Sequence, residues 1–196
     1  ALSSEAGLSP GIYSHATTEN FRNLYQGMRD AGVRAINNSW GNPSFFASFN
    51  TLKSVQTDYF KFLKAPSWLD AAIDATKMTA DGREGVIQVF VSDNQGSANP
   101  AARGALPYFR PDAEGHWLTV TAHEKTKDGY GQLFNKCGIA KYWCVAAPGG
   151  GVASTVFDGA YGTYSGTSMA APHATGALGI IMERYPYMNN EQTLQV

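Results

Sequence analysis

The 196-residue sequence has little that would suit a nucleic-acid or membrane partner. Charged residues make up 16% of the chain and the formal net charge is -1, so the basic excess that nucleic-acid binding needs is absent. No apolar run approaches the roughly 18 residues of a membrane-spanning helix. Residues 1–10 lack the basic start and apolar core of a signal peptide. Either the protein is cytosolic, or the chain begins after such a segment has been removed.

The chain is also poor in cysteine, with only Cys137 and Cys144. Their C-x6-C spacing is too wide for a redox C-x-x-C motif, and there is no second pair to complete a zinc site. The spacing favours a local disulfide, which would add about 2.5 kcal/mol on the chain-entropy model. Two reduced core thiols are the alternative. A disulfide would favour an exported protein.

Apolar residues make up 43% of the chain, enough for one domain with a sizeable core. Phe21, Leu24, Tyr25 and Met28 repeat at the spacing of one helical face. Residues 85–94 form a continuous apolar run, typical of a strand buried on both faces. Alternating helices and strands predict an α/β fold of three layers, with a mostly parallel central sheet and helices on both faces. Other expected elements are strands at 33–41, 116–124 and 142–150, helices at 67–77, 168–185 and 189–196, a hairpin at 156–166, and a long connection with some helix at 42–66.

Small residues surround Ser168 in the stretch YSGTSMAAPHATGALG. The helix expected from Ser168 onward is apolar nearly all round, so we expect it to be central and buried. First-turn amides have no helical partners, and the helix dipole favours negative charge, so the Ser168 N–H is well placed to stabilise an oxyanion. Gly166 gives the chain freedom to turn sharply and leaves room for a substrate. The plain alternative is that Ser168 only caps a helix packed through its small residues.

The segment GTSMAAPHATG, residues 166–176, resembles the serine motif of the subtilases, the subtilisin-like serine proteases. Upstream, VFVSDNQGSANPAARGALPYF resembles the segment whose asparagine completes the oxyanion hole, and GVRAINNSWG resembles the strand that lines the substrate cleft. The likeness covers about residues 18–196, and CGIAKYWCVAAPGGG is similar to the protease domains of bacterial autotransporters. It implies that residues 1–196 are part of one subtilisin-like peptidase domain, exported to the bacterial surface or beyond.

The resemblance also implies residue roles. Ser168 would be the nucleophile that forms an acyl-enzyme, and Asn94 would donate its side-chain amide to the oxyanion. Residues 102–107 would lie near the main specificity pocket. No cofactor is implied, and no loop of Asp or Asn ligands stands out, so no metal is expected. An extended peptide substrate would pair with two flanking segments, Ser39-Trp40-Gly41 and Val91-Ser92-Asp93. Asp93 either touches the substrate or is a solvated loop carboxylate.

Two members of a serine-protease triad are not found. Subtilases carry the aspartate in an Asp-Thr/Ser-Gly motif and the histidine in a His-Gly-Thr-His motif, and this chain has neither. His173 belongs to the serine motif, but it lies about 140° around the helix from Ser168 and is expected to be structural. His15, His116 and His123 have no motif context and are expected to be structural or surface residues.

Without a base, the Ser168 hydroxyl stays protonated and is a poor nucleophile. We therefore expect an N-terminal segment of the same protein to supply the Asp and the His. We expect the 196-residue chain alone to hydrolyse peptides poorly or not at all. Strand edges that such a segment would cover should be exposed.

Two other functions share parts of these motifs. A non-catalytic relative would use the same cleft only to bind peptides, although it would need neither Ser168 nor Asn94. A sedolisin-type carboxyl protease also carries a Gly-Thr-Ser nucleophile. However, its oxyanion residue is an aspartate, and the MAAPH that follows Ser168 fits subtilases better.

Overall fold

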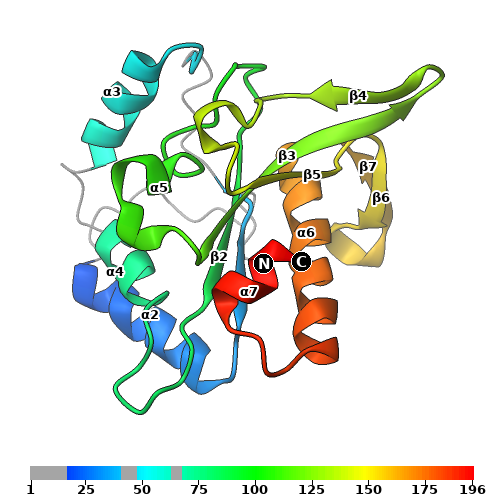
Figure 1. Ribbon diagram of the computed structural model, residues 1–196. Helices are drawn as coiled ribbons and strands as arrows, with labels where there is room; N and C mark the ends of the chain where they lie inside the picture. The colour runs from blue at the N-terminus through cyan, green and yellow to red at the C-terminus, as the bar shows by residue number, and fades with distance from the viewer. Residues whose placement is uncertain (1–16, 41–47, 63–67) are drawn as a thin grey trace.

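A five-stranded sheet runs through the centre of the computed structural model, which describes residues 17–40, 48–62 and 68–196 (Figure 1). Four of its strands are parallel, and only β4 runs antiparallel, to β3. The prediction of a mostly parallel sheet is therefore confirmed. The strands are β1 (Ala35–Asn38), β2 (Ile87–Val91), β3 (Trp117–Thr126), β4 (Gly129–Leu133) and β5 (Cys144–Pro148).

Strand β3 pairs with three neighbours. Val120 pairs with β2 on one edge and with β5 on the other, whereas Ala122 pairs with β4 and β5. Strands β2 and β4 therefore pair with the same edge of β3, and the pairing with β4 begins where the pairing with β2 ends. We did not predict β4, which is short and mostly exposed. Its sequence signal is the Asp128-Gly129 pair, typical of a hairpin turn, and Gly129 has a φ of 124°.

The two faces of β2 pack against different helices, which makes the three layers (Figure 1). Ile87, Val89 and Val91 share a buried cluster with α6 (Thr167–Arg184). Phe90 faces the other side, where it stacks on Trp117 at 4.7 Å between ring centroids. Helices α2 (Thr18–Asp30) and α4 (Trp68–Asp74) add their buried residues to that second cluster. Every residue of β2 is buried, as its continuous apolar run predicts.

Capping fixes the start of α2, where Thr17 and Asn20 form a capping box. The chain leaves this helix through Gly32, whose φ is 80°. Part of the expected connection at 42–66 is helical, as α3 (Leu52–Phe62). Ser67, expected to cap α4, lies outside the described residues. The shorter elements are α5 (Leu106–Phe109), α7 (Asn190–Gln195) and the 3-10 turns η1 (Pro111–Ala113), η2 (Gly138–Ala140) and η3 (Phe157–Gly159).

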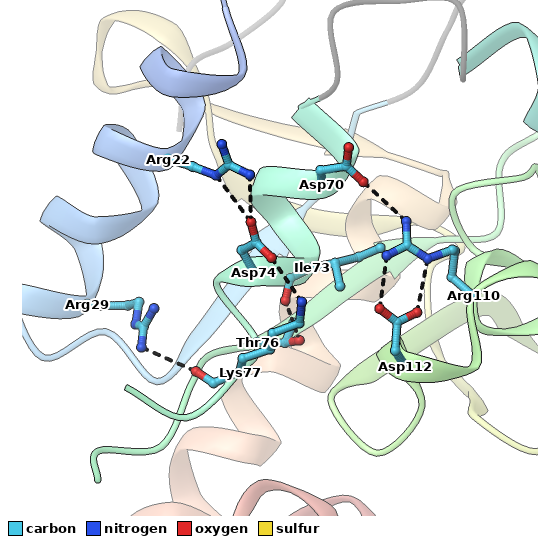
Figure 2. Close-up of polar contacts among 9 residues, drawn as sticks. All are labelled: Arg22, Arg29, Asp70, Ile73, Asp74, Thr76, Lys77, Arg110 and Asp112. Atoms are coloured by element: carbon cyan, nitrogen blue, oxygen red, sulfur yellow. Dashed lines mark hydrogen bonds and ion pairs between the residues drawn. The ribbon is translucent and has the colours of Figure 1, made fainter. Parts of the chain in front are cut away.

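Exposed ion pairs join α4 to its neighbours, as Figure 2 shows. The Arg22 guanidinium on α2 lies 2.9 Å from Asp74 at the end of α4. Arg110 bridges Asp70 of α4 and Asp112 of η1 at 3.2 and 2.9 Å. Such pairs on the surface each stabilise a fold by less than about 1 kcal/mol.

Helix α6 is buried on one face only. Ala170, Ala171, Ala174 and Leu178 pack against the sheet, whereas Ile180 is 69% exposed. The prediction of a helix buried all round is wrong, because none of the described elements covers its outer side. Apolar composition shows that a face can be buried, and only the neighbouring segments decide whether it is.

Exposed apolar side chains also mark the region before α6. The predicted hairpin is present, but it begins earlier, with β6 (Val152–Thr155) paired to β7 (Tyr161–Tyr164). Phe157 in its turn is 86% exposed. Strand β5 forms an edge of the sheet, and its Val145 is 42% exposed. Among the described strands, none pairs with the outer edge of β5.

A disulfide joins Cys137 to Cys144, with 5.8 Å between their Cα atoms. The bond closes the loop that contains η2 and leads into β5. The local disulfide favoured by the spacing is therefore confirmed over two free thiols. In the ranges that the structure describes, no helix has the length and apolar character to cross a membrane.

Candidate active site

Ser168 is the second residue of α6, which begins at Thr167. The residue before the helix, Gly166, has a φ of 164°, an extended conformation that any residue adopts, so a sharp turn is not the reason for glycine there. The cap comes from Asn94, in the loop after β2. Its side-chain Oδ1 accepts hydrogen bonds from the Thr167 backbone N at 3.0 Å and from Thr167 Oγ1 at 2.9 Å. These bonds join the carboxyl end of β2 to the start of α6.

Gly166 keeps a small space open beside the serine. A Cβ atom at this position would lie 3.6 Å from Asn94 Nδ2 and 3.7 Å from the Ser168 backbone N. Thr167 donates two hydrogen bonds to Asn94 Oδ1. These bonds leave the Asn94 amide nitrogen, Nδ2, available to donate into that space. In the described part of the chain, the Ser168 N–H has no backbone hydrogen-bond acceptor. Two N–H donors therefore border one space next to a hydroxyl, an arrangement suited to holding an oxyanion.

Ser39, just beyond β1, is bonded to Ser168 in both directions. Ser39 Oγ donates to the Ser168 carbonyl at 3.0 Å, and Ser168 Oγ donates to the Ser39 carbonyl at 3.3 Å. In a regular helix, the Ser168 carbonyl would accept from the N–H four residues later. That residue is Pro172, which has no N–H. Ser39 thus supplies the hydrogen bond that Pro172 cannot donate to the Ser168 carbonyl. The four-residue spacing from Ser168 to Pro172 is the sequence signal that this carbonyl needs another donor.

None of the histidines that the structure describes contacts the Ser168 hydroxyl. His173 Nδ1 lies 2.8 Å from the carbonyl oxygen of Met169 within α6, as expected for a structural histidine. In the described ranges, no group of three or more His, Cys, Asp or Glu side chains could hold a metal ion. His116 contacts Asn190, and His123 lies edge-on to the Tyr130 ring. His15 falls outside the described residues.

The segments expected to flank a substrate follow β1 and β2. Trp40 is 44% exposed, and its ring contacts Trp68 at 5.0 Å between centroids. Val91 and Ser92 are buried, and Ser92 already uses its backbone N and O in bonds within the protein. Their side chains support the loop rather than face solvent. Gly41 lies outside the described residues.

Asp93 is not a solvated loop carboxylate. Its side chain is 15% exposed and pairs at 3.1 Å with Arg103, whose side chain is 3% exposed. Burial raises the pKa of the Asp93 carboxyl above its ordinary value, and the Arg103 charge only partly opposes this. Arg103 belongs to the 102–107 segment expected near the specificity pocket. Nothing local in the sequence signalled that it would be buried.

The fold is an open, mostly parallel α/β sheet, and Ser168 with its two neighbouring N–H donors lies beyond the carboxyl ends of β1 and β2, where such sheets bind their ligands. The chain belongs to the Subtilase family, which it matches over residues 2–196.

Individual relatives agree with this assignment. The chain is 28% identical over 220 residues to the Extracellular serine protease of Serratia marcescens, covering 87% of this chain and 21% of that protein. It is 25% identical over 196 residues to the Neisserial autotransporter lipoprotein NalP of Neisseria meningitidis, covering 87% and 18%. The structure of Sphericase matches with a TM-score of 0.56 at 22% identity, covering 91% of this chain and 52% of that one, a likeness of fold. The chain spans about a fifth of these curated relatives.

Proposed function

We propose that this chain carries the nucleophile and the oxyanion donors of a subtilisin-type serine endopeptidase. One observation carries the proposal: the Ser168 N–H and the Asn94 amide border the space that Gly166 leaves open. Ser168 Oγ would attack the carbonyl carbon of the scissile peptide bond, and the carbonyl electron pair would move onto oxygen. The two N–H donors stabilise that oxyanion. Its collapse expels the amine and leaves an acyl-enzyme, which water then hydrolyses.

The proton on Ser168 Oγ needs an acceptor stronger than the Ser39 carbonyl to which it now donates. We propose that the triad Asp and His lie N-terminal to these 196 residues in the same protein, so that residues 1–196 are part of one catalytic domain. The uncovered outer face of α6 and the greater length of the relatives support this. The 196-residue chain alone should then show little or no hydrolysis.

The substrate would be an extended peptide lying between the segments 39–41 and 91–93. Backbone pairing with the 39–41 segment would supply affinity with little regard to sequence. The 91–93 segment would border the peptide without pairing along its whole length, because the Ser92 N–H and carbonyl and the Asp93 carbonyl are already bonded within the protein. Names such as "Extracellular serine protease" and "autotransporter lipoprotein" among the relatives support an exported protein, as does the disulfide. A non-catalytic peptide-binding function remains the rival, and the space between the two donors favours the enzyme.

A fluorophosphonate probe tests this function, because it reacts only with an activated serine. We expect the full-length protein to be labelled and its Ser168→Ala variant to remain unlabelled. The isolated 196-residue chain should label far more slowly, because it lacks the base. A folded full-length protein that is not labelled would favour the peptide-binding rival. Rapid labelling of the isolated chain would contradict the placement of the base outside it.

A further inference from the structure

Asp93, the residue before Asn94, has an unusual backbone conformation. Its φ is 85°, in the left-handed region that disfavours residues with a Cβ atom. Such a conformation persists only where the surrounding contacts enforce it, and it is enriched at functional sites. One contact is visible on the backbone itself, where the Asp93 carbonyl accepts from the Asn135 N–H at 3.1 Å.

The Arg103 side chain supplies the second contact. Its Nη2 lies 3.1 Å from Asp93 Oδ2, and its own backbone is fixed because Trp117 Nε1 donates to the Arg103 carbonyl at 2.9 Å. The guanidinium carbon also lies 5.6 Å from the centroid of a Trp40 ring. Arg103 therefore contacts both of the segments that follow β1 and β2, the two segments that border the candidate site.

Stability alone does not explain an ion pair in this place. Burial raises the pKa of Asp93 and lowers that of Arg103, so both charges are disfavoured by their surroundings. Buried pairs of this kind can often be replaced by apolar groups without loss of stability, although removing one partner is harmful. The pair does, however, anchor the side chain of the residue with the positive φ, directly before Asn94.

We propose that the Asp93–Arg103 ion pair positions Asn94, by holding the Asp93 backbone in the conformation that directs the Asn94 amide to the oxyanion. This positioning role presupposes the oxyanion role of Asn94 proposed above. Neither Asp93 nor Arg103 touches the reacting atoms, and both act through Asn94. An oxyanion donor acts on charge that develops in the transition state, so a misdirected Asn94 lowers kcat and leaves KM nearly unchanged.

A double-mutant cycle on the full-length protein tests this coupling with a peptide substrate. Loss of an oxyanion donor costs about 10²–10³ in kcat, a range measured on a subtilisin, and we expect Asn94→Ala to fall within it. Arg103→Met should lower kcat about tenfold with KM within about twofold, because small misplacements of a catalytic group are costly. In the Asn94→Ala background, Arg103→Met should have no further effect on kcat. The matched control is Arg22→Met, which removes the exposed pair with Asp74 and should leave kcat unchanged.

Arg103→Met leaves a buried carboxylate unpaired, so a second variant guards against loss of folding. Asp93→Gly/Arg103→Met removes both charges of the pair and leaves the nearby Asp58 carboxylate, which keeps its hydrogen bond from the Ala102 N–H. Glycine at position 93 permits the same φ without enforcing it. We expect this variant to fold and still to show a kcat about tenfold lower. A kcat equal to that of the parent would overturn the proposal. So would an Arg103→Met effect of the same size with and without Asn94. If Asn94→Ala itself kept the parent kcat, the oxyanion role would fail, and this inference with it.

Discussion

Two Arg–Asp ion pairs of this molecule differ sharply in burial. Arg103 and Asp93, beside the candidate site, are 3% and 15% exposed, with a separation of 3.1 Å. Arg22 and Asp74, on α2 and α4, are 48% and 37% exposed, with a separation of 2.9 Å (Figure 2). Because the distances are so similar, geometry does not distinguish the pairs. Burial decides whether such a pair is a minor surface contact or a fixed constraint on the backbone.

The pKa values of the two carboxyl groups move in opposite directions. At Asp74, partial burial raises the pKa, but hydrogen bonds from Lys77 and Arg22 outweigh it and leave the pKa below its ordinary value. At Asp93, burial outweighs the attraction of Arg103 and the pKa is raised. Ionisation of Asp93 therefore opposes folding as the pH rises through its folded-state pKa, whereas ionisation of Asp74 favours folding.

The largest effect on stability should come from breaking the buried pair on one side. Arg103→Met should lower the free energy of unfolding by about 3–5 kcal/mol, because the Asp93 carboxylate stays buried without its partner. Urea unfolding of the purified protein measures this loss. Asp93→Gly/Arg103→Met should recover part of it, since the Asp93 charge is gone while the buried Asp58 carboxylate, which also attracts Arg103, still lacks that partner. An equal loss in the double variant would show that the unpaired Asp93 charge is not its cause.

Substitution of Ser39 should have a smaller effect on the free energy of unfolding, because its hydroxyl bonds an uncharged group, the Ser168 carbonyl. Ser39→Ala removes the hydroxyl that donates to the Ser168 carbonyl, and should lower the free energy of unfolding by about 1–2 kcal/mol. The matched variant is Ser39→Ala/Pro172→Ala, in which residue 172 regains an N–H for that carbonyl. Urea unfolding should show the loss largely reversed in the double variant. If restoring this N–H changes nothing, Ser39 stabilises the protein in another way.

The parts of the fold that the sequence predicts are those set by local pattern. Strand β2 and helix α2 follow from apolar spacing, which needs no knowledge of distant segments. Whether the outer face of α6 is buried depends on which segments pack beside it. The apolar residues around Ile180 therefore predict burial, whereas Ile180 is exposed in the structure. Strand β4 is exposed and short, and only its Asp-Gly turn signals it.

The candidate site shows the same division. Ser168 and Asn94 could be predicted from motifs, and the structure brings them together through Thr167. The effect of Pro172 on the Ser168 carbonyl was readable from a spacing of four residues. The pairing of Arg103 with Asp93 could not be read from the sequence, because arginine is usually solvated. Here contacts with residues distant in sequence, such as Trp40, accompany the burial of its side chain.

The smallest effect should come from the exposed pair. Asp74→Asn should lower the free energy of unfolding by less than about 1 kcal/mol at low salt, and by less still at high salt, where exposed charges are screened. Because the folded-state pKa of Asp74 is lowered, its contribution is present above the unfolded-state pKa and is lost as the pH falls through the folded value. Urea unfolding of parent and variant at neutral and acidic pH, at two salt concentrations, measures both dependences. The difference between the two proteins should shrink on acidification. A large difference in unfolding free energy that salt does not reduce would contradict this prediction. It would mean that the exposed Asp74 pair stabilises the protein as strongly as the buried Asp93–Arg103 pair.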